Sequence, residues 1–294
     1  MTELAVFFAN YPTAFPWVAG LFGLAIGSFL NVAIHRLPVM LERRWRSQCQ
    51  EIIGPDKSPA APAQRFDLAV PRSRCPHCDH AITALENIPV LSFLWLKGKC
   101  SDCGKPISWR YPAVELLTAC FSALVAWHFG FTIAALAGLA LTWSLIALTF
   151  IDFDRQLLPD DITLPLLWAG LLLNVTNVYV PISSAVIGAA AGYVSLWLVY
   201  QLFKLVTGKE GMGYGDFKLF AALGAWLGWQ SLPLIILMAS LVGAVVGLAF
   251  ILFFGHDRRV PIPFGPFLCV SGWIALMWGE TLTRYYLQFS RITV

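Results

Sequence analysis

Long apolar stretches alternate with short polar segments along most of the chain. A helix needs about 20 mostly apolar residues to cross a hydrocarbon core of about 30 Å. The pattern predicts spans at 16–37, 112–130, 131–151, 162–180, 182–206, 232–254 and 264–287. An eighth apolar segment, 217–229, is short and is either a protein-buried span or a re-entrant helix. The sequence therefore predicts an all-α polytopic membrane protein with about eight transmembrane helices.

Composition supports this fold class and excludes others. Of 294 residues, 58% are hydrophobic and 13% charged, whereas soluble domains are about half apolar and about a quarter charged. The net charge of +3 is too small an excess to indicate nucleic acid as a partner. Only Glu3 is charged before Arg36, so no basic region precedes the first apolar segment, and we do not expect it to be a cleavable signal peptide.

The basic residues predict the orientation of the chain. Twelve of the 20 Lys and Arg residues lie between Arg36 and Arg110, and the positive-inside rule places that loop in the cytoplasm. If all eight segments cross, 18 of the 20 lie on the cytoplasmic side, and Arg284 and Arg291 lie outside. Counting 217–229 as a crossing is what keeps this assignment consistent.

The cytoplasmic loop divides into two parts. Residues 38–74 are rich in Pro, Ala, Arg and Gln and predict a solvated linker or a loosely packed insertion, whereas residues 75–103 form a tighter module. We therefore expect three regions: an N-terminal transmembrane helix at 1–37, the loop at 38–111, and a transmembrane domain at 112–294.

Four cysteines in the loop have the spacing of a metal site. Cys75, Cys78, Cys100 and Cys103 form C-x2-C-x21-C-x2-C, which suits one tetrahedral zinc ion. Four thiolates leave no open position, so such a zinc would be structural. Disulfides or free thiols are the alternative, and His77 or His80 could replace a cysteine. Three more cysteines lie without partners in the sequence pattern, at Cys49, Cys120 and Cys269.

Aspartates cluster at the cytoplasmic ends of the predicted spans. They are Asp152, Asp154, Asp160, Asp161 and Asp216. Carboxylates at the edge of a bilayer are functional candidates by default. Asp161 and Asp216 each precede an apolar helix, and for Asp161 we expect a capping role.

Alternate glycines set Asp216 apart from the other aspartates. Gly211, Gly213 and Gly215 precede it, which predicts unusual backbone angles and a wall against which an extended substrate backbone can lie. Two neighbouring carboxylates can hydrolyse a peptide bond, one as base and one as acid. Pairing Asp152 with Asp216 is a hypothesis that spacing alone does not establish.

At these residues the chain resembles the type IV prepilin peptidases, which are membrane aspartic proteases. The matching motifs run in the family's order over nearly the whole length. They are Gly27 to Val32, Arg36-Leu37-Pro38, Cys75-Pro-x-Cys78, Glu86-Asn87-Ile88-Pro89, Cys100-x-x-Cys103, Arg110-Tyr111-Pro112-x-Val114-Glu115, Asp152 through Asp160, and Gly213-Tyr214-Gly215-Asp216-Phe217-Lys218.

The resemblance implies a bifunctional enzyme of the bacterial inner membrane, a GxGD-type aspartic protease with catalytic residues Asp152 and Asp216. It implies cleavage of basic leaders from prepilins and type II secretion pseudopilins, after glycine and before a hydrophobic residue, commonly Phe. A second activity methylates the new α-amine with S-adenosylmethionine. The sequence shows no glycine-rich loop for that cofactor, so Glu86, Asn87, Arg110 and Glu115 are only candidates, and structural pairing is an equal alternative.

Two other functional classes are weighed against this interpretation. A proton-coupled transporter would place its acids near the bilayer midplane, often within repeated halves, whereas here the acids lie at span ends and no repeat is visible. A zinc-module scaffold without chemistry explains the cysteines but leaves the Gly213-Tyr214-Gly215-Asp216 motif without a role. The oligomeric state and the identity of the processed pilins are left open by the sequence.

Overall fold

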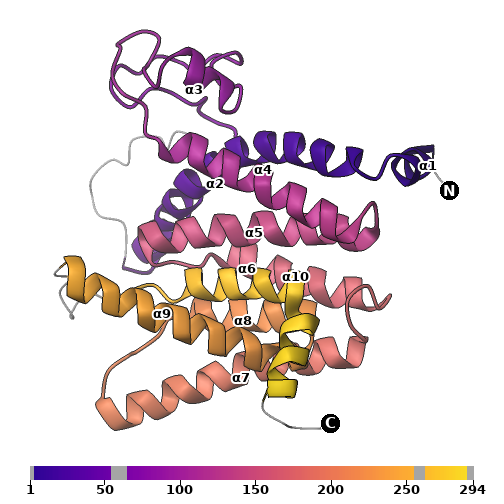
Figure 1. Ribbon diagram of the computed structural model, residues 1–294. Coiled ribbons are helices and arrows are strands. Elements are labelled where there is room, and N and C mark those ends of the chain that lie inside the picture. The colour runs from indigo at the N-terminus through magenta and orange to yellow at the C-terminus, as the bar shows by residue number, and fades with distance from the viewer. Residues whose placement is uncertain (1–2, 54–64, 255–261, 290–294) are drawn as a thin grey trace. The chain divides into compact units, whose positions relative to one another are not determined.

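A computed structural model describes residues 3–53, 65–254 and 262–289 of the chain (Figure 1). The described residues form helices and no β-strand beyond two isolated bridges. The chain divides into two compact units, Met1–Gly130 and Phe131–Val294.

The first unit is built on two long helices. It contains α1 (Glu3–Asn10), α2 (Ala14–Ile53), the short α3 (Leu91–Trp95) and α4 (Arg110–Phe129). Glycines let α2 and α4 approach closely: a Cβ on Gly23 would lie 2.7 Å from Ser122 Oγ, and one on Gly27 would lie 2.6 Å from Glu115 Cα. Small residues at helical spacing are a common way to join helices in a membrane.

The structure corrects the expected linker at 38–74. Residues 38–53 continue α2 through Pro38, giving a helix of 40 residues, about 60 Å long and twice the thickness of a bilayer core. Pro38 removes one helical hydrogen bond, and Figure 1 shows α2 changing direction along its length. Residues 67–71 are held against α2, because buried Arg36 donates to the carbonyls of Asp67 (2.9 Å) and Pro71 (2.6 Å). The Pro- and Ala-rich run 59–63 lies outside the described residues.

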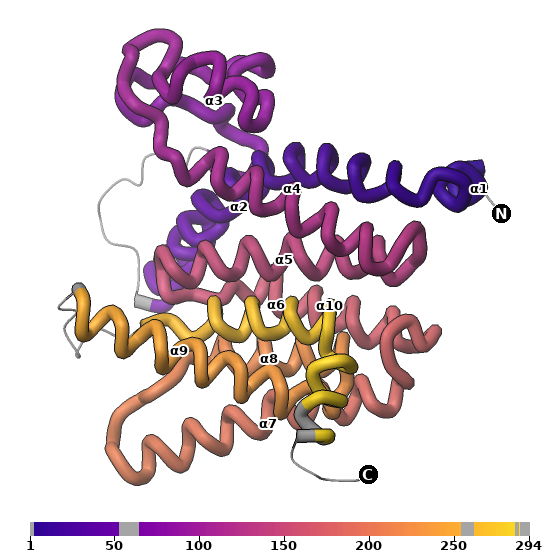
Figure 2. Tube along the Cα trace, viewed as in Figure 1, coloured from indigo at the N-terminus to yellow at the C-terminus, as the bar shows by residue number. Residues whose placement is uncertain are grey.

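The second unit surrounds one short, buried helix. Its elements are α5 (Ile133–Arg155), α6 (Asp160–Asn174), α7 (Ile182–Thr207), α8 (Tyr214–Leu227), a 3-10 turn (Trp229–Ser231), α9 (Leu232–Phe254) and α10 (Gly265–Phe289). Every residue of α8 from Asp216 to Leu227 is buried except Lys218. Helix α8 contacts α6, α7, α9 and α10, and Figure 2 shows its trace among them. A helix that is apolar all round is expected in such a core position.

Two local features fix α8 in place. Gly188 on α7 and Gly224 on α8 face each other so closely that a Cβ on either would collide with the other's backbone. At the end of α6, the buried amide of Asn174 donates to the carbonyls of Ala225 (2.9 Å) and Trp226 (3.0 Å). The side-chain oxygen of Asn174 accepts from the backbone amides of the following loop, so one side chain ties three segments together.

Five of the described helices are long and apolar enough to cross a membrane: α2, α4, α5, α7 and the stretch Trp229–Phe253. Helices α6 and α8 contain 15 and 14 residues, fewer than the about 20 that a full span needs. Residues 162–180 were expected to form one span, but the helix ends at Asn174 and a turn follows. Helix α10 has 25 residues, with a break in helical geometry at Trp278.

Candidate active site and metal centre

The second unit brings together two aspartates that lie 64 residues apart in the chain. Asp152 lies in the last turn of α5 and Asp216 in the first turn of α8. Both are buried, with exposed fractions of 5% and 8%. Each carboxylate lies within the electrostatic range of the other. The two carboxylates thus lie in the same part of the second unit, and their action as a catalytic pair stays a prediction.

Helix α10 begins directly against Asp152. The backbone amide of Gly265, the first residue of α10, hydrogen-bonds the Asp152 carboxylate. A Cβ on Gly265 would lie 2.5 Å from Asp152 Oδ2, so a side chain here would displace the Asp152 carboxylate or the start of α10. Sequence reasoning missed Gly265, because the only signal was one glycine after a polar loop.

The glycines before Asp216 act through packing. A backbone hydrogen bond from Gly213 reaches the Asp216 carboxylate. A Cβ on Gly215 would lie 2.7 Å from Leu158 Cβ, and a Cβ on Gly265 would lie 3.1 Å from Leu158 Cδ1. Leu158, in the loop after α5, thus packs against both the start of α8 and the start of α10. The expected unusual backbone angles are absent, since Gly213 has an ordinary extended φ of −82° and neither Gly211 nor Gly215 has a positive φ.

The other acidic residues lie around the pair and are exposed. Asp160 forms an ion pair with Lys218 on α8, with both carboxylate oxygens 2.7 Å from Nζ. Asp161 is the second residue of α6 and lies in its first turn, where a carboxylate complements the helix dipole, but Pro159 occupies the N-cap position, so Asp161 is not the N-cap residue. Cys269 on α10, which has no partner in the sequence pattern, is buried within electrostatic range of both Asp152 and Asp216.

In the first unit, four cysteine sulfurs converge. The Sγ atoms of Cys75, Cys78, Cys100 and Cys103 all lie within 4.8 Å of one another, and all seven cysteines are free thiols. Two of the distances, from Cys75 to Cys103 and from Cys78 to Cys100, are 3.9 Å. Thiolates about 2.3 Å from one tetrahedral ion would be about 3.8 Å apart. The cluster therefore fits one metal ion, which confirms the grouping predicted from spacing.

Both cysteine turns have the same hydrogen bonds. The amide of Cys75 donates to His80 O and that of Asp79 to Cys75 O, while Cys100 donates to Lys105 O and Gly104 to Cys100 O. Asp79 and Gly104 each adopt positive φ at equivalent places in the turn. Backbone amides of His77 and Cys78 lower the pKa of the Cys75 thiol to about 7, which favours the thiolate that binds metal.

Glu86 joins the two halves of this module. Its carboxylate accepts hydrogen bonds from Ser101 Oγ and from the Thr83 amide (2.8 Å) and hydroxyl (2.9 Å). These donors, Ser101 first, lower the pKa of Glu86 to about 2. His80 Nε2 lies 3.3 Å from Glu86 Oε2, so the His80 ring faces Glu86. The metal cluster consists of the four cysteine sulfurs and does not include His80.

The remaining candidates for cofactor binding lie near the same module. Glu115 on α4 is 8% exposed, accepts a hydrogen bond from the amide of Val90 (2.8 Å), and is also bonded by the Ser28 hydroxyl on α2. Val90 has a positive φ of 58°, which a β-branched residue rarely adopts, so Glu115 holds a strained turn. The side chain of Asn87 is exposed and that of Arg110 is half-buried.

Comparison with known proteins gives consistent matches over both units. Residues 21–129 match the model described as the bacterial peptidase A24 N-terminal domain, and residues 139–248 match the type IV leader peptidase family. A protein of Aeromonas salmonicida is 59% identical over 277 residues, covering 93% of this chain and 95% of the relative. Relatives from Stutzerimonas stutzeri and Pseudomonas aeruginosa are 55% and 54% identical, each over 97% of this chain and at least 97% of the relative. All three carry the name prepilin leader peptidase/N-methyltransferase. No solved structure matches the chain.

Proposed function

The chain belongs to the type IV leader peptidase family, and on that premise we propose that it removes the basic leader of prepilins and pseudopilins and then methylates the new N-terminus. Cleavage would follow a glycine and precede a hydrophobic residue, commonly Phe. The observation that carries the proposal is the meeting of buried Asp152 and Asp216 at the ends of α5 and α8.

The two carboxylates can hydrolyse a peptide bond without a covalent intermediate. One ionised aspartate takes a proton from water while the water oxygen bonds to the scissile carbonyl carbon, and the other, protonated, donates its proton to the carbonyl oxygen. The C–N bond then breaks and the nitrogen receives a proton, which leaves a leader carboxylate and a free α-amine. Like charges at short range favour one shared proton, so the pair would titrate as a unit.

The arrangement in the membrane is a second part of the proposal. We place the chain in the bacterial inner membrane with about eight crossings, counting α6 and α8 as short spans, of which α8 is buried in protein. The loop 38–111 and both aspartates would face the cytoplasm, because most Lys and Arg residues then lie on that side. A substrate with a basic leader and an apolar helix would present its scissile bond on the same face.

The four-cysteine module would hold one structural zinc ion. Four sulfurs close the coordination sphere, and a module of about 30 residues needs such a centre because it cannot bury enough apolar surface by itself. When bound, S-adenosylmethionine supplies the methyl group. Glu86, Asn87, Arg110 and Glu115 are the candidates for contact with that cofactor, and Glu86 and Glu115 also make hydrogen bonds within the first unit.

The functional regions follow from these assignments. We propose residues 38–111 as the methyltransferase-associated region and 112–294 as the peptidase region. Helix α4 packs on α2 within the first unit, and the unit boundary falls after Gly130. The second unit, which contains both aspartates, lies within the proposed peptidase region.

A single reaction tests the proposal against its rivals. The purified protein is incubated with a prepilin and labelled S-adenosylmethionine, and the product N-terminus is examined by mass spectrometry. We expect cleavage after glycine together with label on the new amine. Absence of both would favour a transporter or a scaffold, and cleavage without label would remove the methyltransferase assignment.

A further inference from the structure

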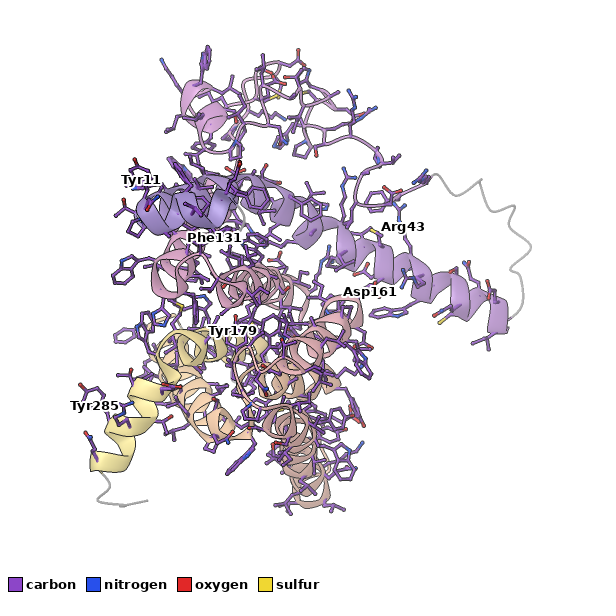
Figure 3. All side chains as sticks on the ribbon, turned by 90° about the vertical axis from the view of Figure 1, so that its right-hand side faces the viewer. Tyr11, Arg43, Phe131, Asp161, Tyr179 and Tyr285 are labelled. Carbon is purple, nitrogen blue, oxygen red and sulfur yellow. The ribbon has the colours of Figure 1, made fainter. Side chains whose placement is uncertain are left out.

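A long apolar groove runs along the second unit between α5 and α6. It encloses about 790 Å³ and extends from Asp161 in the first turn of α6 to the loop after that helix. Ile133, Leu136 and Ala140 line it from α5, and Ala169 and Leu172 line it from α6. Figure 3 labels Asp161 and Tyr179, which mark opposite ends of the segment that contains α6.

The floor of this α5–α6 groove is fixed by packing. Trp226 of α8 lines it, and its indole N–H donates to the carbonyl of Leu166 at 2.7 Å. Gly170 has no side chain at the point where Trp226 packs, and a Cβ there would collide with the indole ring. The rim of the groove is apolar and exposed, and the exposed fraction of Leu172 is 67%. The groove is therefore a preformed apolar channel that would open to the hydrocarbon.

One end of the groove joins the acidic corner of the proposed active site. Asp161 lines the groove, and the adjacent Asp160 pairs with Lys218, two residues after Asp216. Residues 152–161 and 213–218 together carry five carboxylates and two basic groups, although the whole chain has a net charge of +3. This corner is complementary to a cationic segment.

We propose that the α5–α6 groove binds the apolar helix of the substrate, with the basic leader lying over the acidic corner. This inference rests on the proposed peptidase function. From Asp161 to Leu173 the groove follows about 18 Å of α6, enough for about 12 residues of an apolar helical partner. A phospholipid in the same place would bring its phosphate against the carboxylates, so the charge pattern favours a peptide with a cationic end.

Filling the groove tests the proposal. Ala140→Phe and Ala169→Phe each add a ring inside it, whereas Ala190→Phe adds the same ring at an exposed position on α7 outside it. We expect the two groove variants to raise KM for a prepilin by about tenfold or more with kcat retained, and the control to leave both constants unchanged. A folding defect would instead lower kcat.

Photo-crosslinking identifies the occupant. A photoreactive residue is placed at Leu172, in the groove, or at Leu198, which is 54% exposed on α7, in an Asp152→Asn background that retains substrate. We expect prepilin adducts through its apolar segment from position 172 only. Lipid adducts alone at 172, or an unchanged KM in both groove variants while the wild type cleaves, would overturn the inference. Failure of the wild type to cleave would instead refute the proposed function.

Discussion

Replacing Gly265 with alanine should disable peptide cleavage while leaving the fold intact. Gly265 begins α10, and its backbone amide hydrogen-bonds the carboxylate of Asp152. The new Cβ would lie 2.5 Å from Asp152 Oδ2, 3.2 Å from Asp152 Cγ and 3.1 Å from Leu158 Cδ1. The new methyl group would therefore overlap the proposed catalytic carboxylate of Asp152 and the side chain of Leu158, which also packs against Gly215 at the start of α8.

The size of the effect follows from that overlap. Ordinary van der Waals contact begins at about 3.4 Å, so the Asp152 carboxylate or the start of α10 must move by about 0.9 Å. A displacement of about 1 Å in a reacting group can reduce a rate by about 100-fold, because the reacting atoms no longer meet in line. We expect a fall of that order in kcat for prepilin cleavage, with a smaller change in KM.

Gly279→Ala on the same helix is the matched control. A Cβ there meets only Ala275 Cβ at 3.8 Å, an ordinary contact. The assay compares cleavage of a prepilin by the two purified variants, with methylation of an already cleaved pilin as a check on folding. Cleavage by Gly265→Ala within twofold of Gly279→Ala would refute the close approach of α10 to Asp152.

Three further predictions concern the first unit. Glu115→Ala leaves the Val90 amide without its acceptor, so the free energy of unfolding should fall by about 1–3 kcal/mol. Glu115→Gln keeps an acceptor and should lose less stability. Thermal unfolding in detergent measures both variants. Cys78→Ser should remove the single equivalent of zinc and make the module sensitive to protease, whereas a wild-type protein that carries no metal would refute the metal centre. Folding lowers the pKa of Glu86 from 4.5 to about 2, so its contribution to stability is complete above pH 4.5 and is lost as the pH falls towards 2. Glu86→Gln should lack this acid-dependent part of the stability when the free energy of unfolding is measured against pH.

The chemical groups were predictable from the sequence because each lies in a motif with a physical reason. Cys75 and Cys103 belong to pairs whose spacing suits one metal ion, and the structure gathers their sulfurs. Asp152 and Asp216 were notable because carboxylates at span ends are costly, and the structure buries both, one at the end of α5 and one at the start of α8. In these cases local chemistry indicated a long-range contact.

The parts that the sequence did not predict depend on packing between distant segments. Gly265 is one glycine among 23, and only the position of α10 shows why a side chain cannot be accommodated there. Asn174 lies in a stretch expected to continue as a span, yet its amide ends α6 by binding the carbonyls at the end of α8. Residues 38–53 were expected to belong to a linker, but α2 continues through Pro38, and Arg36 binds the loop at 67–71.

The most direct test of the central claim is the cleavage rate of Asp152→Asn and Asp216→Asn. Each purified variant is incubated with a prepilin, and methylation of a precleaved pilin is measured in the same preparation. Because hydrolysis needs one carboxylate as base and the other as acid, neither variant should produce detectable cleavage, and both should methylate at the wild-type rate. Cleavage at the wild-type rate by either variant would contradict the assignment of that residue to the catalytic pair.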